Sequence, residues 1–103
     1  MKAIWLTIPA VAALLVAGTA SADLALAKKS GCMACHAIDK KVVGPSWNDI
    51  GAKYSAEADG KATVLASITD GSRGKWGKIP MPPQKRLSAE NADKLAAFIL
   101  TLK

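Results

Sequence analysis

Cys32-Met33-Ala34-Cys35-His36 is the stretch of this 103-residue sequence with the most specific chemistry. In an exported protein, the spacing C-x-x-C-H is typical of covalent c-type haem attachment. Two thiols three positions apart can reach the two vinyl groups on one side of a porphyrin. The next residue then lies under the ring, where its imidazole can bind the iron. The motif predicts one covalently bound haem, with Cys32 and Cys35 as thioether residues and His36 as the proximal ligand.

Three other interpretations of the two cysteines stay open. A disulfide could form in an oxidising compartment, but it would close a very small loop and so stabilise little. A thioredoxin-like redox pair is expected in a βαβ setting, and the sequence shows no convincing strands. A structural zinc site needs about four ligands. Beyond residue 22 the chain offers two cysteines and one histidine as good ligands.

The second axial ligand follows from the few side chains that could supply it. His36 is the only histidine, which excludes two-histidine ligation. Of the three methionines, Met1 belongs to the N-terminal leader and Met33 lies between the cysteines. Met81 remains, and the prolines around it have fixed φ angles that make its loop stiff. The alternatives are Met81 as a core side chain, a lysine ligand, or an open iron position.

Residues 1–22 predict a cleavable secretory signal peptide. Lys2 supplies a positive start, residues 3–17 are largely apolar, and residues 18–22 are small and end in an A-x-A pattern. The predicted location is therefore the periplasm. The alternative is an uncleaved membrane anchor, but the apolar run is short for a span of about 20 residues and Pro9 interrupts it. No stable membrane anchor is expected.

Cleavage after Ala22 would leave one domain, residues 23–103, and cleavage after Ala20 is the other possibility. The leader accounts for much of the mean hydropathy of +0.18, and losing Lys2 lowers the net charge from +6 to +5. A domain of this size buries little of its surface, and it has few aromatic residues. A multidomain enzyme, a repeat protein and a large self-sufficient core are excluded. We expect the cofactor to fill the centre.

Helical periodicity with intervening loops predicts an all-α fold. The expected helices are residues 24–30, capped by Asp23 and ended by Gly31; residues 47–54, capped by Ser46; a stretch after Asp59 and Gly60 that stops at residues 70–72; and a C-terminal helix capped by Ser88. The C-terminal helix has an apolar stripe at Ala92, Leu95, Ala96, Ile99 and Leu102. The N-terminal helix is its expected packing partner. Residues 71–87 are rich in glycine and proline and are expected to be irregular.

Four segments together resemble the small bacterial class I cytochromes c of the c-551/c-552 type. They are the attachment motif, Val43-Gly44-Pro45, Trp76-Gly77-Lys78-Ile79-Pro80-Met81-Pro82-Pro83, and the C-terminal helix. They cover essentially all of residues 23–103. The resemblance implies about four short helices wrapped around one covalent haem c. It also implies one-electron transfer in the periplasm rather than catalysis.

The resemblance assigns roles to two further residues and leaves two positions unexplained. The Pro45 carbonyl would accept the ring N–H of His36, and the Trp76 indole would donate to a haem propionate, although Trp76 could also be a core side chain. A basic residue that meets a propionate in relatives is replaced by Ser67, for which Arg73 or Lys75 could substitute. An asparagine three residues after the methionine ligand is replaced by Gln84.

Lysine and arginine flank both motifs: Lys28, Lys29, Lys40, Lys41, Lys75, Lys78, Lys85 and Arg86. If they ring the haem edge, they would steer redox partners that carry acidic docking patches; otherwise they are ordinary solvated residues. Reductases, peroxidases and terminal oxidases are plausible acceptors by resemblance, with an upstream donor. Nucleic acid is not expected as a partner, and the protein is expected to be a monomer.

Three functional classes remain distinguishable. The favoured one is a diffusible electron carrier. The second is a haem enzyme or gas sensor, which needs an open iron position that Met81 argues against. The third is a haem-free exported protein with a disulfide.

Overall fold

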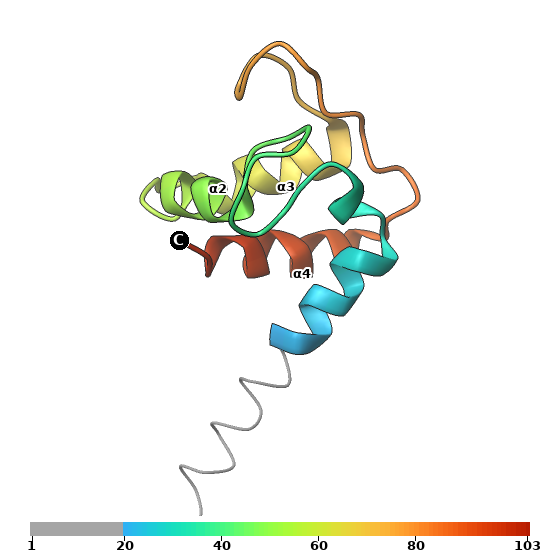
Figure 1. Cartoon of the computed structure of the whole chain (residues 1–103). Coiled ribbons are helices and arrows are strands. Elements are labelled where there is room, and N and C mark those ends of the chain that lie inside the picture. The colour runs from blue at the N-terminus through green and yellow to red at the C-terminus, as the bar shows by residue number, and fades with distance from the viewer. Residues whose placement is uncertain (1–19) are drawn as a thin grey trace, which may run out of the picture.

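The computed structural model describes residues 20–103, which are largely helical (Figure 1). Residues 20–29 are helical, and η2 (Cys32–Ala34), α2 (Trp47–Tyr54), α3 (Gly60–Asp70) and α4 (Ala89–Leu100) follow. Within residues 20–103 the only extended pairing is one isolated antiparallel bridge, between Ser72 and Met81. The predicted all-α fold is confirmed. Most of the expected signal peptide, residues 1–19, lies outside the described residues.

Serine side chains begin two of the helices, as the sequence predicted. The Ser46 hydroxyl accepts the Asp49 N–H at 3.1 Å, and the Ser88 hydroxyl accepts the Asn91 N–H at 3.1 Å. Each bond satisfies an amide that has no partner within its helix.

The predicted start of the first helix is wrong. Residues 20–22 are already helical, so Asp23 lies inside the helix and is not its N-cap. Alanines at positions 20 and 22 favour helix strongly, so residues 20–22 are helical although they belong to the stretch that suggested a cleavage site. The predicted end is right: Gly31 follows at φ +82°, a left-handed conformation that glycine adopts without steric cost.

One apolar core joins the helices. Helices α2, α3 and α4 pack against one another in pairs. Four residues of the predicted α4 stripe are buried, while Leu102 is only partly buried. Ala27, from helical residues 20–29, is fully buried in the same core, as expected for the N-terminal helix. No helix within residues 20–103 is long and apolar enough to cross a membrane.

The loop from residue 71 to residue 87 leaves the end of α3, extends beyond it and returns to the start of α4 (Figure 1). The Ser72 N–H donates to the Met81 carbonyl at 3.0 Å, and the Met81 N–H donates to the Ser72 carbonyl at 2.9 Å. The Gln84 backbone N–H donates to the Ile68 carbonyl at 2.9 Å, which ties the second half of the loop to α3. The irregular segment therefore has a defined path, and it carries Met81 to a fixed position.

Candidate haem site

A cavity of about 650 Å³ lies between the helices and the loop that carries Met81. Its floor is apolar and is made by side chains from three helices: Ile50 of α2, Val64 and Ile68 of α3, and Leu95 and Ile99 of α4. Leu95 and Ile99 belong to the apolar stripe that helical periodicity predicted for the C-terminal helix. The volume is within the range of about 300–1,000 Å³ that is usual for sites of small molecules and cofactors.

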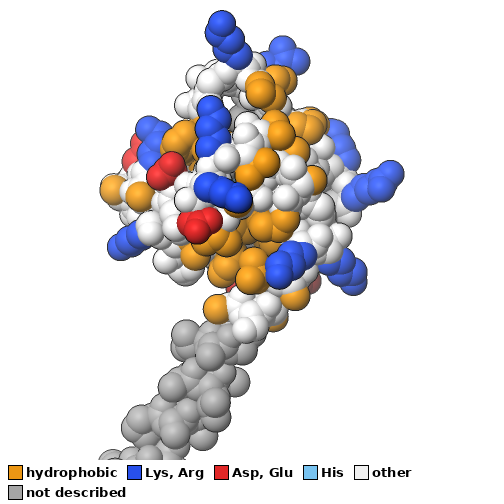
Figure 2. Space-filling view, viewed as in Figure 1, with side chains coloured by type: hydrophobic (Ala, Val, Ile, Leu, Met, Phe, Trp, Pro, Cys, Tyr) orange, Lys and Arg blue, Asp and Glu red, His pale blue; other side chains and the backbone are white. Residues whose placement is uncertain are grey.

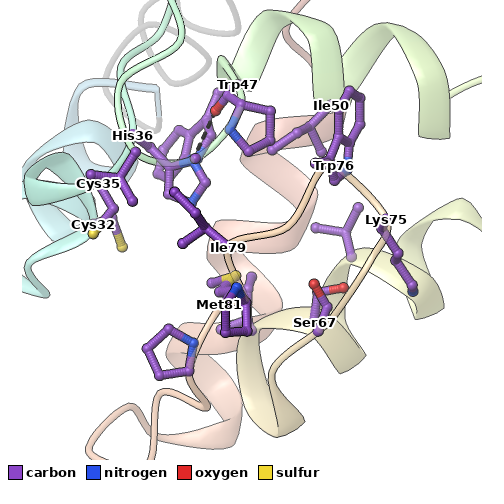
Figure 3. A pocket seen from close by; sticks show the side chains of 18 of the residues that line it. Cys32, Cys35, His36, Trp47, Ile50, Ser67, Lys75, Trp76, Ile79 and Met81 are labelled. Carbon is purple, nitrogen blue, oxygen red and sulfur yellow. Dashed lines mark hydrogen bonds between the residues drawn. The ribbon is translucent and has the colours of Figure 1, made fainter.

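The two cysteines lie at one edge of this cavity (Figure 3). The short helix η2 brings them together, and the Cys35 N–H donates to the Cys32 carbonyl at 3.2 Å. Both thiols are free. Burial raises the pKa of the Cys32 thiol, although a backbone hydrogen bond acts in the opposite direction. Among residues 20–103 there is no group of three potential metal-binding side chains of the zinc-site type.

His36 is buried in the cavity wall with its ring orientation set by a hydrogen bond. Its Nδ1 lies 2.9 Å from the Pro45 carbonyl oxygen. Because a carbonyl oxygen can only accept, this bond places the proton on Nδ1 and leaves the Nε2 lone pair free. The contact that the resemblance implied between His36 and Pro45 is therefore present.

Gly44 is a site residue whose role the sequence reasoning missed. A Cβ at this position would lie 2.5 Å from Cε1 of His36, so only glycine lets the backbone pass against the imidazole. Its N–H also donates to the Cys35 carbonyl at 2.7 Å. The available signal was the glycine itself, next to the proline whose carbonyl orients the ring.

Met81 reaches the cavity from the loop. Figure 3 shows its thioether and the His36 imidazole facing the same space from different segments of the chain. The two backbone hydrogen bonds to Ser72 hold Met81. After Met81, the Gln84 side-chain amide donates to the Pro82 carbonyl at 2.8 Å. Gln84 thus braces the loop three residues after Met81.

Trp76 and Lys75 line the side of the cavity away from the cysteines (Figure 3). The Trp76 ring makes an edge-on contact with Tyr54 at a centroid distance of 6.3 Å, and 37% of Trp76 stays exposed. Trp76 is therefore a rim residue and not part of the buried core. Ser67 also lines the cavity, whereas Arg73 does not.

The family model described as Cytochrome c matches residues 24–103. The chain is a member of the cytochrome c family. Cytochrome c-552 of Nitrosomonas europaea is 56% identical over the whole of both chains. Cytochrome c-551 of Pseudomonas denitrificans is 53% identical, over 76% of this chain and 94% of its own. The crystal structure of wild-type Nitrosomonas europaea cytochrome c552 matches with a TM-score of 0.75 and 49% identity, over 78% of this chain and 99% of the other.

Membership of the cytochrome c family confirms the small class I monohaem fold. It also establishes one covalent haem c and the role of an electron carrier rather than an enzyme. The cavity fits such a group. It is large enough and apolar, with two thiols at one edge and a nitrogen and a sulfur donor facing its interior. The haem-free disulfide interpretation is thereby set aside.

Proposed function

We propose that this cytochrome c is a periplasmic one-electron carrier whose haem is attached through Cys32 and Cys35 and bound axially by His36 and Met81. The observation that carries the proposal is the convergence of the imidazole and the thioether on one cavity with two free thiols at its edge. When bound, the haem supplies an iron centre that gains and loses one electron.

The protein's own contribution is to keep both axial donors in place. Pro45 fixes the tautomer and orientation of His36, and Gly44, which has no Cβ, lets the backbone pack directly against the ring. Backbone bonds to Ser72 and the flanking prolines restrain Met81. With both donors restrained, little movement of the protein would accompany oxidation or reduction of the bound haem. Ligation by a thioether and an imidazole would also favour a high reduction potential.

Export to the periplasm is supported by two observations. Residues 1–22 have the charged start, apolar run and small-residue end of a signal peptide. The solved relative matches 78% of this chain while covering 99% of its own, and residues 23–103 make up about that share. We propose that residues 1–22 are removed and that residues 23–103 form the mature domain.

The ligation is tested by carbon monoxide, which needs an iron position that protein does not occupy. We expect the ferrous protein at neutral pH to show no change in its absorption spectrum under carbon monoxide. The reference is the same protein after denaturation in guanidinium chloride, in which Met81 is free to leave and binding should appear. Ready binding by the native protein would favour a ligand-binding haem protein over a carrier.

We further propose that redox partners dock through acidic patches. Lys41, Lys75 and Lys78 line the cavity, and within its described lining there is no aspartate or glutamate. Ile79, 67% exposed, adds an apolar contact surface beside them. Figure 2 shows exposed apolar side chains on one face with Lys and Arg side chains around them, together with a few Asp and Glu side chains. Such a face suits a donor and an acceptor, such as a reductase, peroxidase or terminal oxidase, that meet a monomer transiently.

The positive rim can be tested with two small oxidants of opposite charge. We expect the oxidation rate by anionic ferricyanide to fall with rising ionic strength, and the rate with cationic tris(bipyridine)cobalt(III) to rise. Lys78→Glu should slow ferricyanide several-fold at low salt. Lys94→Glu makes the same change of net charge on α4, outside the cavity lining, and should have a much smaller effect. Equal effects of the two variants would show that net charge, and not a rim at the cavity, directs the reaction.

A further inference from the structure

Trp47 is an aromatic side chain that lies against the His36 imidazole, and the proposed attachment and ligation give it no role. The centroids of the two rings are 5.9 Å apart, with 41° between their planes. Both side chains line the cavity (Figure 3). Trp47 is only 3% exposed, so its ring is a packed part of the cavity wall beside the imidazole.

The hydrogen bond to Pro45 does not by itself fix the whole imidazole ring. It holds Nδ1 of His36 at 2.9 Å from the carbonyl oxygen, but one hydrogen bond restrains one atom. The torsion that turns an imidazole about its Cβ–Cγ bond has broad preferences, so packing has to supply the rest of the orientation. Gly44 packs its backbone directly against the ring, because a Cβ there would lie 2.5 Å from Cε1. The Trp47 ring is the second contact.

Trp47 is itself held by two other parts of the fold. Its backbone N–H donates to the Ala37 carbonyl at 3.0 Å, so the start of α2 is bonded to the residue directly after His36. Phe98 of α4 packs edge-on against the Trp47 ring, at a centroid distance of 6.2 Å and an interplanar angle of 77°. Aromatic pairs favour this arrangement. Because buried side chains are closely packed, a ring held in this way restrains the imidazole and does not simply follow it.

We infer that Trp47 is a positioning residue that fixes the rotation of the His36 imidazole in the holoprotein. The inference rests on the proposed axial ligation by His36. Binding of iron through Nε2 leaves one rotation open, that of the ring plane about the iron–nitrogen bond. Pro45 and Gly44 restrain the ring on the side of Nδ1 and Cε1, and Trp47 completes the restraint. The imidazole plane then has one orientation, so electron exchange does not require the ligand to turn.

The test is proton nuclear magnetic resonance of the ferric holoprotein with cyanide in place of Met81. Cyanide is symmetric about its own axis, so the hyperfine shifts of the haem ring methyl groups depend on the plane of the opposite imidazole. We expect Trp47→Leu to change the order and spacing of these methyl resonances, because leucine leaves the imidazole room to turn. Trp47→Phe keeps an aromatic ring and should give a pattern close to that of the wild type.

Leu95→Ala is the matched control for a loss of packing in the core. Leu95 is buried and also lines the cavity, but it belongs to α4 and leaves the aromatic contact of His36 intact. It should lower the melting temperature at least as much as Trp47→Leu and change the methyl pattern several-fold less. An unchanged pattern in Trp47→Leu, or an equal change in Leu95→Ala, would overturn the inference.

A second variant serves if Trp47→Leu does not fold. Phe98→Leu removes the edge-on contact behind Trp47 and should change the methyl pattern in the same direction to a smaller extent, so an unchanged pattern there counts equally against the inference. Hyperfine-shifted ring protons of His36 in the wild type separate this inference from the proposed function. If they are present and Trp47→Leu has no effect, only the role of Trp47 is wrong. If they are absent, His36 does not bind the iron and both proposals fail.

Discussion

Met81→Ala should leave the haem attached and lower the midpoint potential by on the order of a hundred millivolts or more, within the range of about 0.8 V that axial ligands span. In the described cavity lining, the sulfur atoms belong to Cys32, Cys35 and Met81. The Met81→Ala change removes the thioether among them. Water or another harder donor would take its place and stabilise ferric iron. Potentiometric titration measures the change, and the ferrous variant should now bind carbon monoxide.

Met33→Ala is the matched control for the Met81 variant. Met33 is partly buried in η2, between the two cysteines, and does not line the cavity. The same methionine-to-alanine change there should leave the potential close to that of the wild type. An unchanged potential in Met81→Ala would show that another group, such as a lysine, binds the iron.

Replacing both cysteines, Cys32→Ser with Cys35→Ser, should abolish covalent haem and cooperative folding together. The cavity holds about 650 Å³ at the centre of the helices. An unfilled apolar void destabilises a core in proportion to its volume, and an ordinary domain is stable by only about 5–15 kcal/mol. The chain is therefore expected to lose its tertiary packing rather than keep the cavity.

The double cysteine variant is examined by a pyridine haemochrome assay and by thermal melting followed with circular dichroism. We expect no bound haem after purification in denaturant and a broad, weakly cooperative melt. Ala34→Ser places the same hydroxyl in the same turn at an exposed position and should keep both haem and the cooperative transition. A native-like melt of the haem-free double variant would contradict the view that the cofactor is the core.

Local features of the fold were predictable where the side chain acts on its own backbone. Ser46 and Ser88 cap helices because a hydroxyl can accept an amide three residues on, and Gly31 ends a helix because it adopts positive φ. The failure at Asp23 has the same origin. A residue can act as an N-cap only if the residues before it are not helical. Residues 20–22 are helical, so Asp23 lies within the helix.

Site features that depend on packing were not predictable from spacing. Gly44 is required by the His36 imidazole, which lies eight residues earlier in the chain and is brought to it by the fold. The contact between Tyr54 and Trp76 joins α2 to the far loop. From the sequence alone, Arg73 and Lys75 were equally good substitutes for the basic side chain that Ser67 replaces. The structure places Lys75, and not Arg73, in the cavity wall.

By itself, the sequence determined the chemistry of this protein. Covalent attachment uses two closely spaced thiols, and iron binding uses an imidazole next to them; the chain has one such set. It also narrowed the candidates for the second iron ligand to Met81, because the chain has few histidine and methionine side chains. Only the tertiary structure decided that Met81 and His36 face one cavity and that Lys75 lies on the wall away from the cysteines. The physical reason is that these groups are far apart along the chain, and only the packing of α2, α3 and α4 and the backbone bonds of the 71–87 loop bring them together.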